Sequence, residues 1–274
     1  KISANSSPKT LENILRLDKH CQYASRSLQH NEKFYDFSLK SLNFKNARHP
    51  QKRKFMQNSK QTITEKIFSE HVGREVFAGE IIESDIDMVI GNDITTPISI
   101  KQFERSGATK LANPDGFSVV MDHYIPAKDI LSANQAKISR DFAYKHDLKN
   151  YFDEKDMGIE HALLPEKGLV VPGDVIIGAD SHTCTHGALG AFATGMGSTD
   201  LAYAMITGKN WFKVPPTIKV IFRGKLDRHV YGKDLILEII RRIHSFDPCI
   251  ACAVHVMDAK GAELGCYRVD PSKG

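Results

Sequence analysis

The sequence contains no long apolar run and few cysteines. No stretch approaches the roughly 20 apolar residues that a membrane helix needs, so we expect no membrane segment. The first residues of the sequence given also lack the charged-then-apolar pattern of a secretory signal. Five cysteines, an odd number with one CxxC pair, argue against a disulfide scaffold and for a reducing compartment. These features together predict a cytoplasmic protein.

Acidic residues are scarce in the first part of the chain. Residues 1–60 hold 13 Lys and Arg against 4 Asp and Glu, whereas the whole chain carries a net charge of +4. The segment KNARHPQKRKFMQNSK shows neither a helical nor a strand period. Such a basic run fits a nucleic-acid contact or a solvated extension. We expect a poorly ordered extension without a nucleic-acid partner, and a natural start at Met56, just before the first well-formed element.

From about residue 61 to residue 240, helix and strand patterns alternate. Helices are predicted at TITEKIFSEHVG, which opens with a Thr62–Glu65 capping box, and at TPISIKQFERSG, SANQAKISRDFAYKHDL and GKDLILEIIRRI. Strands are predicted at DIDMVIGND, FSVVMDH, DVIIGADSH and TIKVIFRG. The segment ALGAFATGMGSTDLAYAMITG, rich in small residues, is predicted to be a closely packed helical region. This alternation indicates an α/β fold with helices on both faces of a largely parallel sheet.

Ionisable residues follow two of the predicted strands. Asp122 and His123 come after VVM, and Asp180, Ser181 and His182 come after VIIG. Ligands of parallel sheets bind beyond the carboxyl ends of the strands. An aspartate beside a histidine orients the imidazole and raises its basicity, which suits acid–base chemistry. On an extended strand the side chains of Asp122 and His123 would diverge, so they share one site only if the backbone turns there.

Three more residues near these strand ends carry groups that can react. His161 lies in GIEHALLPEKG, which reads as a connection bounded by glycine and proline, a favourable place for a functional residue. Cys184 is interpreted as a small buried group and His186 as a polar residue at a helix entry.

The residues by themselves leave three functions open. The first is an acid–base lyase that acts on a hydroxy acid. The second is a metal-dependent hydrolase, and the third is a non-catalytic protein whose basic leader binds nucleic acid. The hydrolase would bind zinc or manganese through a set of carboxylates and imidazoles. That set is Asp122, His123, His161, Asp180 and His182.

Several segments between residues 61 and 240 resemble the aconitase family, and within it the large subunits of 3-isopropylmalate dehydratases. The resemblance rests on FAGEIIESDIDMVIGNDITTPISIKQF, VVMDHYIP, MGIEHALLPEKGLVVPGDVIIGADSHTCTHGALGAFATGMGSTD and GKNWFKVPPTIKVIFRG. It implies a three-layer α/β/α fold that corresponds to the first part of the large subunit. The implied activity is a hydro-lyase that interconverts 2-isopropylmalate and 3-isopropylmalate in leucine biosynthesis. A related aconitase or homoaconitase is the alternative within the family.

The resemblance also implies roles for residues. Asp122 and His123 would protonate the departing hydroxyl of a small dicarboxylic hydroxy acid, and His161 would support them. Asp180, Ser181 and His182 would line the pocket for substrate and cluster. A serine base and the arginines that grip the substrate carboxylates would come from a separate small subunit. A 4Fe–4S cluster, one iron of which acts as a Lewis acid, is implied as cofactor.

The last segment departs from this resemblance. RIHSFDPCIACAVHVMD is similar to the C-terminal end of NiFe-hydrogenase large subunits, which implies metal ligation by Cys249 and Cys252, with His255 beside them. A fragment without partner ligands is the interpretation that we favour, because two thiolates and a histidine rarely hold a cluster unaided. The cysteine ligands of the aconitase cluster are not recognisable, so this chain alone is expected to be inactive. The expected organisation is an extension at 1–60, an aconitase-like domain at 61–240 and a CxxC tail at 241–274.

Overall fold

The computed structural model of the chain describes residues 61–218, 220, 228–243, 252–257 and 263–269. The described part of the chain divides into two compact units, one that ends at Val214 and one that begins at Pro215. The predicted basic extension at 1–60 lies outside the described residues. None of the helices in the described ranges is long and apolar enough to cross a membrane.

Helices and strands alternate along the unit that ends at Val214, as the sequence predicts. Its helical elements are α3 (Ile63–Val72), α4 (Thr96–Arg105), η3 (Pro114–Gly116), α5 (Ile130–Lys145), α6 (Glu160–Glu166), η4 (Ser181–Leu189) and α7 (Ser198–Thr207), of which η3 and η4 are 3₁₀ segments. Its strands are β1 (Ile81–Asp85), β2 (Met88–Asn92), β3 (Phe117–Val120), β4 (Asn150–Phe152), β5 (Val175–Gly178), β6 (Phe192–Gly195) and β7 (Lys209–Lys213).

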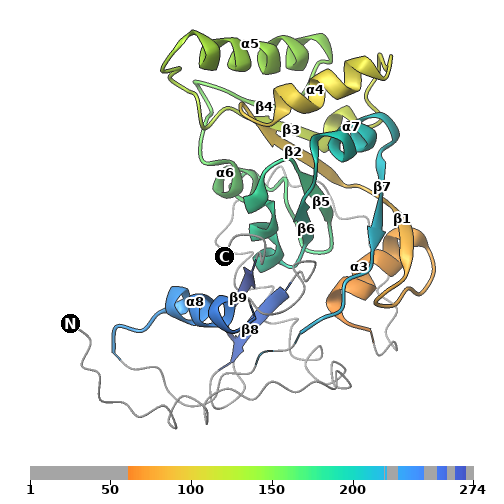
Figure 1. Cartoon of the computed structure of the whole chain (residues 1–274), viewed down its shortest axis with the longest axis vertical. Helices are drawn as coiled ribbons and strands as arrows, with labels where there is room; N and C mark the ends of the chain where they lie inside the picture. Colours follow the sequence, from red (N-terminus) through yellow and green to blue (C-terminus); the bar gives the residue numbers. More distant parts are fainter. Residues whose placement is uncertain (1–60, 219, 221–227, 244–251, 258–262, 270–274) are drawn as a thin grey trace. The chain divides into compact units, whose positions relative to one another are not determined.

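A five-stranded parallel sheet forms the centre of this unit, in the order β4-β3-β2-β5-β6. Helices α4, α5 and α7 cover one face, and α6 lies on the other (Figure 1). Parallel strands need such crossover helices, since each strand must return to the same end of the sheet. The prediction of a three-layer α/β/α fold is therefore confirmed.

Both faces of the sheet are buried by residues that alternate along each strand. On β2, Val89 packs in the core that includes α4, α5 and α7, whereas Met88 and Ile90 pack in a second core with Leu163 and Leu164 of α6. Successive strand residues point to opposite faces, so a strand covered on both sides must be apolar throughout. This explains the continuous apolar runs that the sequence shows at β2, β3 and β5.

The ends of the first helices follow their local sequence signals. Thr62 and Glu65 form the predicted capping box at the start of α3, and Gly73 ends the helix with φ of 75°. Helix α4 begins at Thr96, with Pro97 in its first turn, and Gly107 follows its end with φ of 79°. Both predictions are confirmed to within a residue.

The segment predicted as one helical region is instead a strand followed by a helix. β6 (Phe192–Gly195) pairs with β5, and α7 begins only at Ser198. Tertiary contacts make this segment a strand, because Phe192 and Ala193 are buried where they pair with the edge of β5. Gly195 also permits a close approach, since a Cβ there would lie 2.8 Å from the Asp180 carbonyl oxygen.

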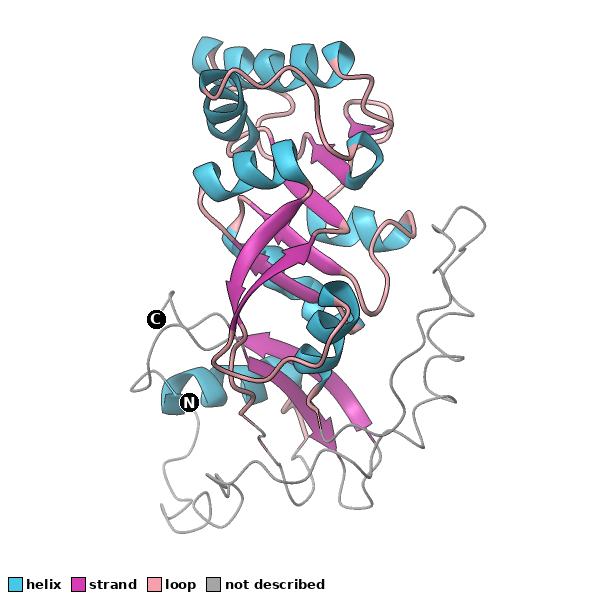
Figure 2. Ribbon diagram, turned by 90° about the vertical axis from the view of Figure 1, so that its right-hand side faces the viewer, coloured by secondary structure: helices cyan, strands magenta, loops and turns pink. Residues whose placement is uncertain are grey.

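Strands β1 and β7 are among the strands that the sequence analysis did not predict. β1 and β7 pair antiparallel, with Ile81 opposite Lys213 and Asp85 opposite Lys209. Figure 2 views the protein from the side on which these strands lie in Figure 1 and shows them as a twisted ribbon. The pairing joins residues more than a hundred positions apart, so local sequence patterns carry little information about it.

The second unit contains α8 (Gly232–Ile243), which confirms the predicted helix at GKDLILEIIRRI. It also contains an antiparallel pair, β8 (Cys252–Met257) and β9 (Glu263–Val269). The strand predicted at TIKVIFRG lies largely outside the described residues. Cys249 also lies outside them, and the structure describes the backbone of Cys252 in β8 but not its side chain. The predicted metal site of the tail therefore stays a prediction.

Candidate active site

Polar side chains gather at the carboxyl ends of three neighbouring strands of the parallel sheet. Asp93 follows β2, Asp122 and His123 follow β3, and residues 180–182 follow β5. The N-terminus of α6 adds Glu160 and His161. Because parallel strands all end at the same edge, this is the position where such sheets bind ligands.

Asp122 and His123 form the first acid–histidine pair. Strand β3 ends at Val120, so the backbone turns before these residues and their side chains meet. His123 Nδ1 lies 2.5 Å from Asp122 Oδ1, and the His123 side chain is 41% exposed. Nδ1 is thereby held by the carboxylate, which leaves Nε2 as the nitrogen that can face a ligand.

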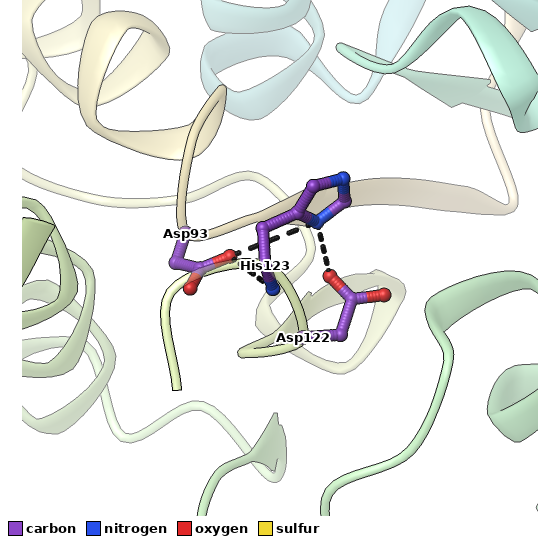
Figure 3. Close-up of side chains that lie close together, drawn as sticks. All are labelled: Asp93, Asp122 and His123. Atoms are coloured by element: carbon purple, nitrogen blue, oxygen red, sulfur yellow. Dashed lines mark hydrogen bonds and ion pairs between the residues drawn. The ribbon is translucent and has the colours of Figure 1, made fainter. Parts of the chain in front are cut away.

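Asp93 fixes the backbone of this pair. Its buried carboxylate accepts hydrogen bonds from the backbone N–H groups of His123 at 3.1 Å and Tyr124 at 2.5 Å. It also lies 3.9 Å from His123 Nδ1. Figure 3 shows the Asp93 and Asp122 carboxylates on opposite sides of Nδ1. The sequence analysis missed Asp93, although its place directly after a buried strand was a usable signal.

His161 and Asp180 form the second pair. His161 Nε2 lies 2.7 Å from Asp180 Oδ2, which also accepts a hydrogen bond of 3.0 Å from the backbone N–H of His182. The ring of His182 is exposed, and its Nδ1 lies 3.1 Å from the same oxygen. Burial alone would raise the pKa of Asp180, but the hydrogen bonds from His161 and His182 outweigh it and lower the pKa to about 2. Asp180 is therefore a carboxylate at neutral pH.

The structure places two residues in or near this second pair, His161 and Cys184, differently from the prediction. His161 lies in the first turn of α6, a short helix, rather than in a connection. Ser181 is partly buried, and its Oγ lies 3.4 Å from His182 Nδ1. Cys184 is partly rather than fully buried, with its Sγ 3.8 Å from the Ser181 carbonyl oxygen.

Glu160 links the two acid–histidine pairs and was missed by the sequence analysis. Its backbone N–H donates a hydrogen bond of 2.7 Å to Asp122 Oδ2. Its side chain is buried; Oε2 accepts a hydrogen bond from Asn92 and lies 3.9 Å from His161 Nε2. Burial and the nearby Asp122 carboxylate raise the pKa of Glu160 to about 8. At neutral pH Glu160 is thus mainly a neutral acid, in contrast to the ionised Asp180.

The interpretation of His186 as a polar residue at a helix entry is wrong. Its side chain is fully buried, and Nε2 lies 3.2 Å from His161 Nδ1. The rings of the two histidines are 5.1 Å apart in an edge-to-face arrangement. The segment η4 packs against β6, α6 and β5, and His186 is buried within it. Burial, and to a smaller extent the neighbouring His161, lowers the pKa of His186 to about 3.

The described residues do not supply the ligands of a 4Fe–4S cluster. Such clusters are held by cysteine thiolates. Among the side chains that the structure describes, Cys184 is the one cysteine. A single thiol does not make the ligand set, so the described side chains do not by themselves fit such a cluster.

The geometry favours proton transfer over metal binding by the histidines and carboxylates. Two groups of three ligand atoms lie within 4.8 Å of one another. They are Asp93, Asp122 and His123, and Glu160, His161 and Asp180. In each group a histidine nitrogen is already hydrogen-bonded to a carboxylate. Direct Asp–His pairs of this kind tune imidazoles for acid–base chemistry.

The fold and the site define a class of protein: an α/β/α protein with acid–histidine pairs at the carboxyl edge of a parallel sheet. Comparison with known families places it more narrowly. A model described as "Aconitase family (aconitate hydratase)" matches residues 65–247. The chain belongs to the aconitase family.

Comparison with individual proteins agrees with the family match. The chain is 93% identical over 183 residues to the 3-isopropylmalate dehydratase large subunit of Campylobacter curvus (strain 525.92). It is 90% identical over 184 residues to the protein of that name from Campylobacter concisus (strain 13826). Both matches cover 67% of this chain but 44% of the relative. The chain therefore spans less than half the length of the relatives that it matches.

Proposed function

We propose that this chain acts as part of the large subunit of a hydro-lyase that interconverts 2-isopropylmalate and 3-isopropylmalate in leucine biosynthesis. The observation that carries the proposal is the pair of acid–histidine contacts joined by Glu160, in a chain so similar to dehydratase large subunits. The name of these relatives supports a separate small subunit as partner. The cytoplasm is the compartment that we expect.

His123 is the proposed proton donor. In the direction of dehydration, its Nε2–H would protonate the departing hydroxyl while the carbon–oxygen bond breaks, with the electron pair remaining on oxygen, so that water leaves. Asp122 at Nδ1 would stabilise the imidazolium before this transfer. The proton on the adjacent carbon would go to a base on the small subunit, as the family resemblance implies.

The second pair has a proposed role in holding the substrate. Asp180 is ionised, Ser181 and His182 are its neighbours, and His161 fixes the carboxylate from the other side. A serine hydroxyl and an imidazole beside a fixed carboxylate can form hydrogen bonds with the hydroxyl of a hydroxy acid. Ser181 and His182 would therefore orient the substrate toward His123.

We further propose that the aconitase-like domain ends near residue 240, with residues 1–60 and 241–274 lying outside it. The cluster that the family implies would take its cysteine ligands from the portion of the relatives that this chain does not match. For that reason we expect the 274-residue chain to be inactive with a small subunit alone.

A segment exchange tests the proposal. The 183 matched residues of the Campylobacter curvus large subunit are replaced by those of this chain, and the protein is produced with its small subunit. We expect interconversion of 2-isopropylmalate and 3-isopropylmalate. His123→Asn should reduce kcat by about 100-fold or more, because general acid catalysis contributes on that order. Lys101→Gln, at an exposed position of α4, is the control and should leave kcat unchanged.

Two results would contradict the proposal. One is an exchanged protein that folds and binds the small subunit but does not interconvert the two acids. The other is full activity of the His123→Asn variant. Hydrolytic turnover of esters by the zinc- or manganese-loaded chain would instead favour the metal-dependent hydrolase.

A further inference from the structure

His186 is a fully buried imidazole that contacts a residue of the candidate site. It lies on η4, where Cys184 is partly buried and Thr185 is exposed. Its Nε2 lies 3.2 Å from His161 Nδ1, and within the described residues its Nδ1 has no hydrogen-bond partner. Burying an imidazole with only one nitrogen hydrogen-bonded costs folding free energy. This cost suggests that the contact between His186 and His161 has a role.

The hydrogen bonds around His161 favour one arrangement of protons at neutral pH. Asp180 is a carboxylate and can only accept, so His161 Nε2 must carry a proton. Because the lowered pKa of His186 keeps it neutral, one of its nitrogens carries a proton and the other does not. In the first arrangement the proton of His186 is on Nε2 and is donated to an unprotonated His161 Nδ1. The Nδ1 of His186 is then an unprotonated acceptor without a partner among the described residues.

The opposite arrangement is less favourable. If His161 were an imidazolium, its Nδ1–H would donate to His186 Nε2, and the proton of His186 would move to Nδ1. That N–H would then be buried with no acceptor among the described residues. A buried donor without a partner is worse than a buried acceptor, since backbone and side-chain acceptors are the groups more often left unsatisfied in proteins.

We propose that His186 is a positioning residue that holds His161 as the neutral tautomer with its proton on Nε2, directed at Asp180. His161 then acts as a fixed hydrogen-bond donor and not as a proton donor to substrate. Asp180 keeps its full negative charge toward Ser181 and His182, which is the side proposed to bind the hydroxy acid. The consequence for catalysis rests on the proposed function; the tautomer itself does not.

Of the titratable groups around His161, the Asp180 carboxylate acts against this arrangement, whereas Glu160 is mainly neutral and the His182 ring carries no negative charge. A nearby carboxylate favours an imidazolium, so the contact with His186 must offset the field of Asp180. The titratable groups around His161 come from three segments of the chain. They are Glu160 on α6, Asp122 after β3, and Asp180 and His182 after β5.

Nitrogen-15 NMR of the full 274-residue chain, labelled at histidine, tests the tautomer directly. His161 signals are identified by their loss in a His161→Gln variant. We expect one protonated and one unprotonated ring nitrogen at pH 7, with the proton on Nε2. If the wild-type chain shows His161 protonated on Nδ1 or on both nitrogens, the proposal is wrong, whether or not any variant folds.

Substitutions then test whether His186 is the cause. His186→Leu removes the donor and should convert the His161 signals to those of an averaged or protonated ring. His186→Gln should restore the wild-type pattern, because a glutamine amide nitrogen reaches about as far as Nε2 of histidine. The control His146→Leu removes a partly buried histidine that caps the C-terminus of α5 and should leave His161 unchanged. An unchanged His161 tautomer in folded His186→Leu would overturn the proposal.

Measurements of enzyme activity distinguish a failure of this proposal from a failure of the proposed function. In the segment-exchanged enzyme, His186→Leu should lower kcat by at least about tenfold with little change in KM, and His186→Gln should recover most of it. If the parent exchanged enzyme is inactive, the proposed function fails, and the NMR result still decides the role of His186. An active enzyme whose kcat is unaffected by His186→Leu would contradict a positioning role.

Discussion

The backbone N–H of Glu160 donates a hydrogen bond of 2.7 Å to the carboxylate of Asp122, 38 residues earlier in the chain. Glu160 immediately precedes His161, so this contact ties the first acid–histidine pair to the helix that carries the second. The Glu160 side chain is buried and accepts a hydrogen bond from Asn92 of β2. The two pairs therefore form one connected site.

Replacing Glu160 should change how stability depends on pH. Burial and Asp122 raise the pKa of Glu160 to about 8, from an ordinary value of 4.5. Between these values the folded chain binds more protons than the unfolded chain, so stability falls as pH rises from 5 to 8. This fall is on the order of 3 kcal/mol for a shift of this size.

Glu160→Gln should remove that part of the pH dependence and be relatively more stable at pH 8 than at pH 5. Urea denaturation at both pH values measures the difference from wild type. Glu166→Gln, at an exposed position of the same helix, should keep the wild-type dependence. The same dependence in wild type and Glu160→Gln would contradict the prediction.

Asp180→Asn should lose stability with the opposite dependence on pH. The folded-state pKa of Asp180 is about 2, below its ordinary 3.8, so its ionisation stabilises the fold above pH 3.8 and the contribution is lost as pH falls toward 2. Allowing for partial exposure, we expect a loss of about 1–2 kcal/mol at pH 6, which shrinks toward pH 3.

Denaturation of the Asp180→Asn variant between pH 3 and 6 checks this prediction. Asp141→Asn is the control, because Asp141 is exposed on α5 and pairs with Lys137 at the surface. A deficit for Asp180→Asn that is constant across this range would show that the carboxylate charge is not its source.

Gly91→Ala should destabilise the fold through one contact. A Cβ at Gly91 would lie 2.3 Å from Thr96 Oγ1, with other atoms at 3.5 Å or more. Overpacking of this kind costs about 1–3 kcal/mol. Because Thr96 Oγ1 is buried without a partner among the described residues, Thr96→Ala removes the clash without breaking a hydrogen bond there.

A double-mutant cycle measures this coupling by thermal or urea unfolding. Gly91→Ala should cost less in the Thr96→Ala background than in the wild type. Equal costs in the two backgrounds would show that the strain lies elsewhere.

Thr62→Ala should weaken the start of α3. Thr62 Oγ1 accepts from the Glu65 N–H at 3.4 Å, and Glu65 Oε2 accepts from the Thr62 N–H at 2.7 Å. Loss of such a cap costs about 1 kcal/mol. Thr62→Ser keeps the hydroxyl and should unfold close to wild type in urea. A Thr62→Ser variant as unstable as Thr62→Ala would point to the lost methyl group instead of the cap.

Elements whose signals are local could be predicted from the sequence. The capping box at Thr62, the glycine after α3 and the apolar runs of β2, β3 and β5 act within a few residues, and so they could be read directly. The position of polar residues at strand ends was also readable, because parallel strands present their carboxyl ends at one edge. Asp122 and Asp180 were found in that way.

The tertiary structure alone decided what depends on distant partners. β6 is a strand because an open edge of β5 lies beside it, and β1 pairs with β7 across more than a hundred residues. Glu160 and His186 belong to the site because the burial of each side chain is set by segments far along the chain, which no local pattern specifies. Their buried polar groups then acquire proton affinities that the sequence does not display, since desolvation by the surrounding fold is the largest cause of both shifts.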